Sequence, residues 1–276
     1  MTGSWRTPHT LAALVVVPAV SVVVGLLLPS AIWAWLVITL VFGALLVVIG
    51  HGLTGYWHGL LIDERNAVSL SRLQAVVWTV LVVSSFVTAC LVNVRVDRPD
   101  PVDISVPGEL WALIGIAATS LVATPLLHQI KEQRRPRKES FAATLRALGY
   151  EVSVAQLGDT ADGSGLRVFT SSPPDRSAPP ESRGVVVVKA SPADSTWSDI
   201  FRGEDTGDAA RPDVGKIQML YFTMAVVVAY AVALGSVFVG ADSGGVDRFP
   251  SLSEGIVALL AISHGAYLVN MAVDRP

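Results

Sequence analysis

Charge is scarce in this sequence, and it is unevenly distributed. Only 16% of the 276 residues are charged, whereas soluble domains carry about 25%. No Asp, Glu, Lys or Arg occurs between Arg6 and Asp63. Further uncharged stretches cover 73–94, 110–130, 217–241 and 255–273. This pattern excludes an ordinary soluble domain.

The uncharged stretches have the length of membrane spans. A bilayer core of about 30 Å needs roughly 20 apolar residues per helix, and backbone groups in lipid must be paired within the segment. The stretch that ends at Asp63 accommodates two helices, with Pro29 and Ser30 at the turn. We therefore expect an all-α membrane protein with about six transmembrane helices.

Several chemical signatures are missing. Cys90 is the single cysteine, which excludes an intrachain disulfide, and it lies inside a predicted span. There is no glycine-rich phosphate loop, no HExxH motif, no nucleophile elbow and no pair of carboxylates inside a span. The sequence therefore predicts no catalytic, cofactor-binding or metal-binding residues. With a net charge of −3 and no basic domain, it also predicts no nucleic-acid partner.

The distribution of Lys and Arg predicts the orientation in the membrane. Cytoplasmic links are enriched in these residues. The link after the fourth predicted span begins with such a cluster, and only Arg95, Arg98 and Arg248 fall in links assigned to the other side. We expect a multi-pass protein with Arg6 near a cytoplasmic N-terminus and Arg275 near a cytoplasmic C-terminus.

An internal repeat is the most specific feature of the chain. The segment from Ser71 aligns with the segment from Gly215 at a constant offset of 144, with matched Gln, aromatic and Thr positions. The helices from Ala112 and Ala258 also align. Each copy is preceded by a lead-in that starts with tryptophan and ends with two acids, at 57–64 and 197–205.

The repeat divides the chain into four segments. A two-helix transmembrane leader covers 1–56, a first helical hairpin 57–130, a cytoplasmic insert 131–196 and a second hairpin 197–276. Both hairpins enter the membrane from the cytoplasm, so the repeat is parallel rather than inverted. Small residues spaced by four predict helix contact faces; they are Ala225, Ala229 and Ala233, then Gly115 and Thr119, then Ala261 and Gly265.

The insert has the pattern of a small α+β element. A helix is expected over 140–148, where apolar residues recur at helical spacing. Short strands are expected at 151–154, 166–170 and 184–189, and the Ser- and Pro-rich stretch 171–183 is typical of a linker. The apolar residues are too few for an independent enzyme domain.

Polar residues within spans are functional candidates, because their burial in lipid is costly. His264 is either a proton-sensitive switch or, more commonly, a neutral histidine hydrogen-bonded within the bundle. Gln74 and Gln218 either bond each other or are satisfied separately. The lead-ins add further candidates, namely Trp57, Trp197, Glu64 and Glu204.

A run of basic residues follows the fourth span. It contains Lys131, Arg134, Arg135, Arg137 and Lys138. Such a run is able to bind anionic headgroups, at about 1 kcal/mol per charge. The alternative is that it only fixes the topology.

Three motifs carry a resemblance to known proteins. They are Ser-Leu-Ser-Arg-x-Gln followed by Trp-Thr (69–74 and 78–79), Trp-x-Asp-x-Phe-x-Gly-Glu (197–204) and Ile-Ser-His-x-x-Tyr-Leu (262–268). With them the chain resembles a broad set of bacterial multi-spanning membrane proteins to which no activity is assigned. The resemblance covers residue 57 to the end. It implies a bacterial membrane location and carries over no functional residues.

Two functions remain open from the sequence. The first is a non-enzymatic membrane anchor or adaptor that binds a cytoplasmic protein partner through the insert and the lead-ins. The second is a small channel or transporter subunit, which would function as a homo-oligomer. The scarcity of charge within the spans favours the first.

Overall fold

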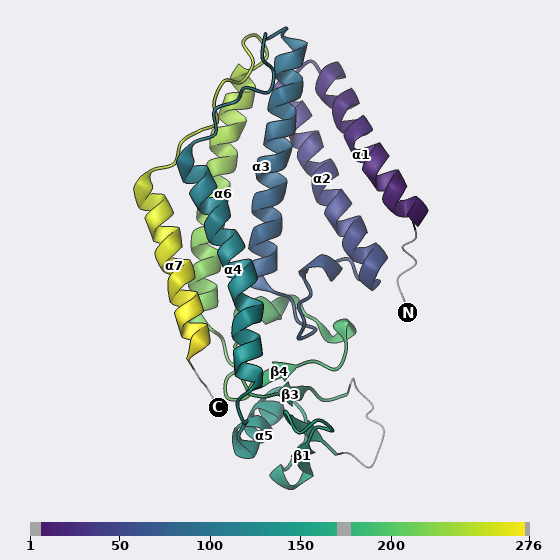
Figure 1. The fold of residues 1–276 in the computed structure, drawn as a ribbon, viewed down its shortest axis with the longest axis vertical. Coiled ribbons are helices and arrows are strands. Elements are labelled where there is room, and N and C mark those ends of the chain that lie inside the picture. Colours follow the sequence, from purple (N-terminus) through teal and green to yellow (C-terminus); the bar gives the residue numbers. More distant parts are fainter. Residues whose placement is uncertain (1–6, 170–177, 274–276) are drawn as a thin grey trace. The chain divides into compact units, whose positions relative to one another are not determined.

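The computed structural model describes residues 7–169 and 178–273, and most of them are helical (Figure 1). The helices are α1 (Thr7–Leu27), α2 (Ala31–Thr54), α3 (Leu70–Arg95), α4 (Gly108–Glu132), α5 (Lys138–Ala147), α6 (Val214–Gly240) and α7 (Glu254–Ala272). Short 3₁₀ turns are η1 (Gly59–Leu61), η2 (Val154–Gln156), η3 (Pro192–Asp194) and η4 (Trp197–Phe201). The strands are β1 (Leu157–Asp159), β2 (Leu166–Val168), β3 (Glu181–Arg183) and β4 (Val186–Val188).

Within the described residues, five helices are long and apolar enough to cross a membrane, namely α2, α3, α4, α6 and α7. Many of their exposed side chains are aliphatic, such as Leu40 in α2 and Val232 in α6. The structure is therefore that of a multi-pass, mainly helical membrane protein. The remaining predicted span corresponds to α1, whose apolar segment Val15–Leu27 is shorter than the other five.

The chain divides into two compact units. Unit 1 contains the described residues up to Leu60, with Leu73–Ala118 and Phe222–Ala261. Unit 2 contains Leu61–Arg72, the described part of Thr119–Tyr221, and the described residues from Ile262 onward. This division differs from the four sequential segments of the sequence prediction, because α3, α4, α6 and α7 each contribute residues to both units.

Unit 1 is built around large side chains. Trp35 of α2 stacks on Phe238 of α6, with ring centroids 5.4 Å apart. The indole of Trp35 also donates to the Ser85 hydroxyl at 2.9 Å, and the hydroxyls of Thr39 and Ser84 lie 2.9 Å apart. Hydrogen bonds between helices stabilise packing where water is absent. They tie α2 to α3.

The predicted small-residue faces are not contact faces within this chain. Ala225, Ala229, Ala261 and Gly265 are exposed. A Cβ atom added at Gly265 would meet nothing within 4 Å. Within the described residues, these positions of α6 and α7 are therefore not buried against another helix, and the contact of α6 with α2 is made by Trp35 and Phe238 instead.

The two repeated helices begin at equivalent positions. Helix α3 starts at Leu70 and α6 at Val214, which preserves the offset seen in the sequence. The residues just before them act as N-caps: the Ser69 hydroxyl accepts from the Arg72 amide at 3.4 Å, and Asp213 accepts from the Lys216 amide at 3.1 Å. A cap satisfies an amide that the first turn leaves unpaired.

The insert forms one helix and two small hairpins. Strand β1 pairs with β2, and β3 pairs with β4, both antiparallel. The Leu166 amide donates to the Ser182 hydroxyl at 2.8 Å and so links the hairpins. A small core of Phe141, Leu145 and Val187 joins them to α5.

The structure of the insert matches part of the prediction and differs from the rest. The expected helix over 140–148 is α5, and the expected strands at 166–170 and 184–189 contain β2 and β4. No strand forms at 151–154; β1 lies further along, at Leu157–Asp159. The predicted linker 171–183 lies partly outside the described residues, and its end, Glu181–Arg183, is a strand.

Candidate functional site: a buried ionic cluster

Charged side chains from both lead-ins meet in unit 2 and are largely withdrawn from solvent. They come from the loops before α3 and α6, from the last turns of α4 and from the first turn of α6. We call this group the ionic cluster; its members are Asp63, Glu64, Arg65, His128, Lys131, Glu204, Asp205 and Lys216.

Glu204 lies at the centre of the ionic cluster. Its side chain is 8% exposed. One carboxylate oxygen lies 3.2 Å from Arg65 and 2.5 Å from Lys216, and the other lies 2.6 Å from His128 Nε2. Burial disfavours the charged form of Glu204, but the positive charges of Arg65 and Lys216 outweigh it and hold the pKa of this carboxyl well below its usual range.

His128 bridges the two lead-ins. Its Nδ1 atom lies 2.5 Å from Glu64 and its Nε2 atom 2.6 Å from Glu204. A neutral imidazole has one N–H, so both nitrogens donate only when the ring carries its second proton. The hydrogen bond from His128 lowers the pKa of Glu64 to about 2. This arrangement is that of an imidazolium held between two carboxylates.

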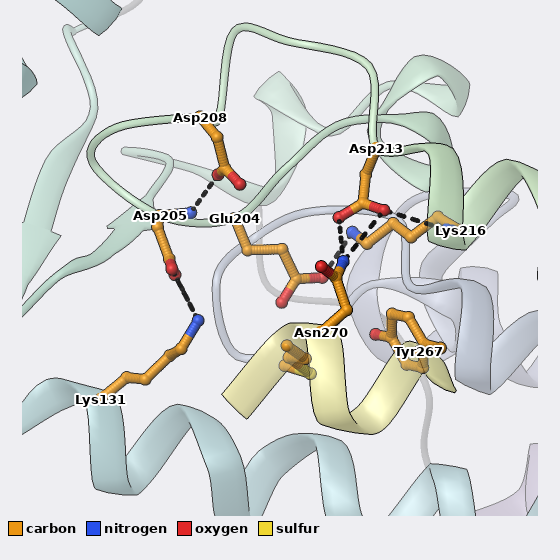
Figure 2. Close-up of a pocket in the computed structure, with 9 residues that line it drawn as sticks. Lys131, Glu204, Asp205, Asp208, Asp213, Lys216, Tyr267 and Asn270 are labelled. Carbon is orange, nitrogen blue, oxygen red and sulfur yellow. Dashed lines mark hydrogen bonds and ion pairs between the residues drawn. The ribbon is translucent and has the colours of Figure 1, made fainter. Parts of the chain in front are cut away.

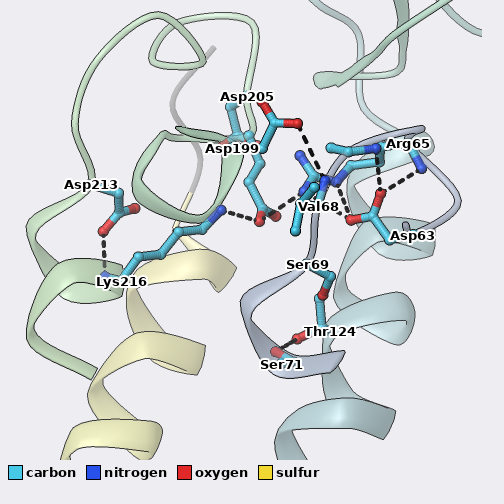
Figure 3. Close-up of polar contacts among 12 residues, drawn as sticks. Asp63, Arg65, Val68, Ser69, Ser71, Thr124, Asp199, Asp205, Asp213 and Lys216 are labelled. Atoms are coloured by element: carbon cyan, nitrogen blue, oxygen red, sulfur yellow. Dashed lines mark hydrogen bonds and ion pairs between the residues drawn. The ribbon is translucent and has the colours of Figure 1, made fainter. Parts of the chain in front are cut away.

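A tight loop presents Arg65 to Glu204. The Asp63 carboxylate accepts from the amides of Arg65 and Ala67, at 2.9 and 3.2 Å, and from the guanidinium of Arg65 at 3.1 Å (Figure 3). Asn66 adopts a positive φ of 56°, a conformation that Asn tolerates better than most residues. These hydrogen bonds within the loop hold Arg65 in the position from which it pairs with Glu204.

Lys131 forms a further ion pair of the cluster, with Asp205. Its ammonium lies 2.9 and 2.6 Å from the two carboxylate oxygens of Asp205 (Figure 2). Burial raises the pKa of Asp205 to about 6, against the effect of Lys131. Lys131 is only 4% exposed. It therefore leaves the predicted headgroup-binding set, because a buried and paired ammonium cannot reach a lipid phosphate.

The charges of the ionic cluster balance when His128 is protonated. Four carboxylates then face the four buried cations Arg65, Lys131, Lys216 and the imidazolium. At the edge of the cluster, the partly exposed Arg72 also lies 3.8 Å from Glu64. Beside Glu204 and Lys216 remains a cavity of about 10 Å³, the space of about one water molecule. No group of three or more His, Cys, Asp or Glu side chains able to hold a metal occurs in the described residues. The ion pairs of the cluster join the loop before α3, the end of α4 and the start of α6.

The polar residues predicted within the spans lie apart from the ionic cluster. The amide of Gln74 donates to Thr223 at 2.8 Å, whereas Gln218 is exposed. The Nδ1 atom of His264 lies 2.7 Å from the Ser120 hydroxyl, and both residues are buried. Gln74 and His264 thus each have a hydrogen-bond partner on another helix.

The predicted aromatic and basic residues are mostly at the surface. Trp57 is 67% and Trp197 is 55% exposed, and the Trp57 ring lies 4.3 Å from that of His51. In the basic run, Arg135 and Arg137 are exposed, whereas Lys138 donates to the Leu157 carbonyl at 3.3 Å and Arg134 is half-buried. Of the predicted candidates, only Glu64, Glu204 and Lys131 belong to the ionic cluster.

Sequence reasoning missed the partners of these residues. Asp63 and Arg65 looked like link residues, Lys216 like a helix entry, and His128 like part of an apolar span. One signal was present: His128 and Lys131 are three residues apart and share a helix face with Thr124. Such a polar stripe at the end of a span indicates burial against another element.

Comparison with known proteins adds no function. No family model, no curated protein and no solved structure matches this chain.

We expect the substitution Glu204→Gln to destabilise unit 2 by about 3–5 kcal/mol, because it leaves buried cations without their counter-charge. The measurement is hydrogen exchange of the insert in detergent or nanodiscs. Glu181→Gln, at an exposed position of β3, is the control and should leave exchange unchanged. Equal exchange in the two variants would show that Glu204 is not a structural centre.

The depressed pKa of Glu64 predicts an acid-sensitive contribution to stability. This carboxyl stabilises the folded state above pH 4.5, its ordinary value, and the contribution is lost as the pH falls toward about 2. The variant Glu64→Gln should therefore be less stable than the wild type above pH 4.5 and lose less stability over that interval. Thermal unfolding across this pH range measures both; parallel curves would contradict the interpretation.

Proposed function

We propose that the chain is a non-enzymatic anchor or adaptor of a bacterial inner membrane, with both termini in the cytoplasm, whose insert binds a cytoplasmic protein partner. The predicted orientation follows from the basic residues after α4. In this orientation the ionic cluster and the insert face the cytoplasm.

The observation that carries the proposal is the ionic cluster. Lys131 at the end of α4 pairs with Asp205, and Glu204 pairs with Lys216 at the start of α6. Strand β4 is bonded to the same segment, since the Val187 amide donates to the Glu204 carbonyl at 2.9 Å. The insert is thus fastened to membrane-spanning helices, and an ordered surface loses less conformational entropy on binding.

The insert offers a cleft of about 380 Å³ as the docking position. Its lining combines apolar and charged groups, among them Tyr150, Pro180, Lys189, Ala193, Ser198 and Arg202. Lys189 is neutralised by Asp199 at 2.7 Å, whereas Arg202 is exposed and adds positive charge. Asp194 belongs to the same lining and offsets the charge of Arg202. The cleft therefore suits an extended partner segment that combines apolar residues with charges of both signs.

Filling the cleft should abolish partner binding. Ala193 is exposed and lines the cleft, so Ala193→Arg places a long charged side chain in it. Ala155, exposed in η2 and not among the lining residues, supplies the matched variant Ala155→Arg. We expect cross-linking pull-down from native membranes to recover the same protein with the wild type and Ala155→Arg, and to lose it with Ala193→Arg. Failure to recover any protein reproducibly would refute the adaptor function.

A transport subunit is the second candidate, and the buried Ser120–His264 hydrogen bond inside α4 and α7 favours it. In an oligomer, the exposed small residues of α6 and α7 would be the contact faces. Flux assays in liposomes across pH distinguish the two functions. Transport predicts flux above empty liposomes that His264→Ala reduces; flux equal to empty liposomes removes this candidate.

A further inference from the structure

The short turn η4 lies level with the starts of two membrane-spanning helices. The carboxylate of Asp199, in the middle of η4, accepts from the Val68 amide at 3.3 Å, two residues before α3. The carbonyl of Phe201, at its end, accepts from the Asp213 amide at 2.7 Å, one residue before α6. The uncharged stretches 73–94 and 217–241 begin three residues into these helices. The turn η4 is therefore bonded to the segments that lead directly into both predicted spans.

The side chains of η4 separate onto different sides. Asp199 and Ile200 are buried, and Ser198 lines the cleft of the insert. Trp197 and Phe201, by contrast, are 55% and 38% exposed and are not among the residues that line the cleft. A turn that exposes two aromatic rings at this level would be costly in water but is suited to the headgroup region.

A cation lies at the same level. Arg211 is exposed, and its carbonyl accepts from the Gly203 amide at 3.0 Å. Next to it, Pro212 pairs with Arg202, the residue that follows η4. Arg211 is thus joined through its backbone to the segment that follows η4. An exposed guanidinium near the headgroups is able to bind a lipid phosphate.

We propose that Trp197 and Phe201 insert into the headgroup region of the bilayer and that Arg211 binds the phosphate of an anionic lipid there. Trp197 and Phe201 do not line the docking cleft, whereas Ser198 and Arg202 of the same lead-in do. The two aromatic rings would therefore contact lipid, and these two residues the protein partner. The inference rests on the membrane embedding of the proposed function, but not on its adaptor role.

Nitroxide labels at single cysteines test the depth of η4. In the background Cys90→Ala, which removes the one native cysteine, the test variants are Trp197→Cys and Phe201→Cys. Asp162→Cys, at an exposed position in the turn between β1 and β2, is the aqueous control, and Val228→Cys, 55% exposed in α6, is the lipid control. The protein is reconstituted in vesicles of phosphatidylethanolamine and phosphatidylglycerol, and accessibility to oxygen and to a nickel chelate is measured.

We expect labels at 197 and 201 to be less accessible to the nickel chelate than the label at 162, and less accessible to oxygen than the label at 228. Labels at both sites that behave like 162, while 228 remains in lipid, would overturn the inference and leave membrane embedding intact. Chelate access at 228 itself would instead overturn the membrane embedding on which both proposals depend.

The lipid phosphate is tested separately. Native mass spectrometry of the extracted protein should show phosphatidylglycerol retained by the wild type and by Arg183→Gln, whose arginine is exposed on β3, and lost from Arg211→Gln. Equal retention in all three proteins would overturn the role of Arg211.

Discussion

The charge of one carboxylate, Glu204, organises unit 2. A buried anion is costly unless cations and hydrogen bonds surround it, and here it is met by Arg65, Lys216 and His128. These partners come from three separate parts of the chain. The ion pairs of Glu204 therefore hold together the loop before α3, the end of α4 and the start of α6. The neighbouring Asp205 connects β4 of the insert to this group, because it forms a β-bridge with Val186.

The two lead-ins contribute unequally to this centre. Each copy supplies an acidic pair, Asp63 with Glu64 and Glu204 with Asp205, but only the first copy continues with an arginine; Thr206 takes its place in the second. The same divergence appears within the spans, where Gln74 binds Thr223 while their counterparts Gln218 and Thr79 are exposed. Helices α3 and α6 are capped at equivalent positions, by Ser69 and Asp213, but their matched residues bind different partners.

The helices could be predicted because lipid imposes a simple rule on the sequence. Long uncharged stretches gave α2, α3, α4, α6 and α7, and the repeat offset matches the starts of α3 and α6. The site was harder to predict, because pairing between residues such as Arg65 and Glu204, 139 positions apart, leaves no periodic signal. Glu64 and Glu204 stand out through their place in the lead-ins, but no pattern in the sequence joins them through His128.

The hairpins of the insert were the least predictable elements. Strands of three residues contain too few side chains for an alternating pattern to emerge. Their positions depend instead on tertiary bonds such as that from Leu166 to Ser182. The small-residue faces failed for a related reason: spacing alone does not tell whether a face meets another helix of the same chain or the surroundings.

The position of Lys216 also bears on how the protein is made. Synthesis runs from the N-terminus, so His128 and Lys131 leave the ribosome before Glu204, Asp205 and Lys216 exist. Until then, His128 has Glu64 beside it but not Glu204, and Lys131 lacks Asp205. The ionic cluster is therefore completed only after the start of α6 has been synthesised.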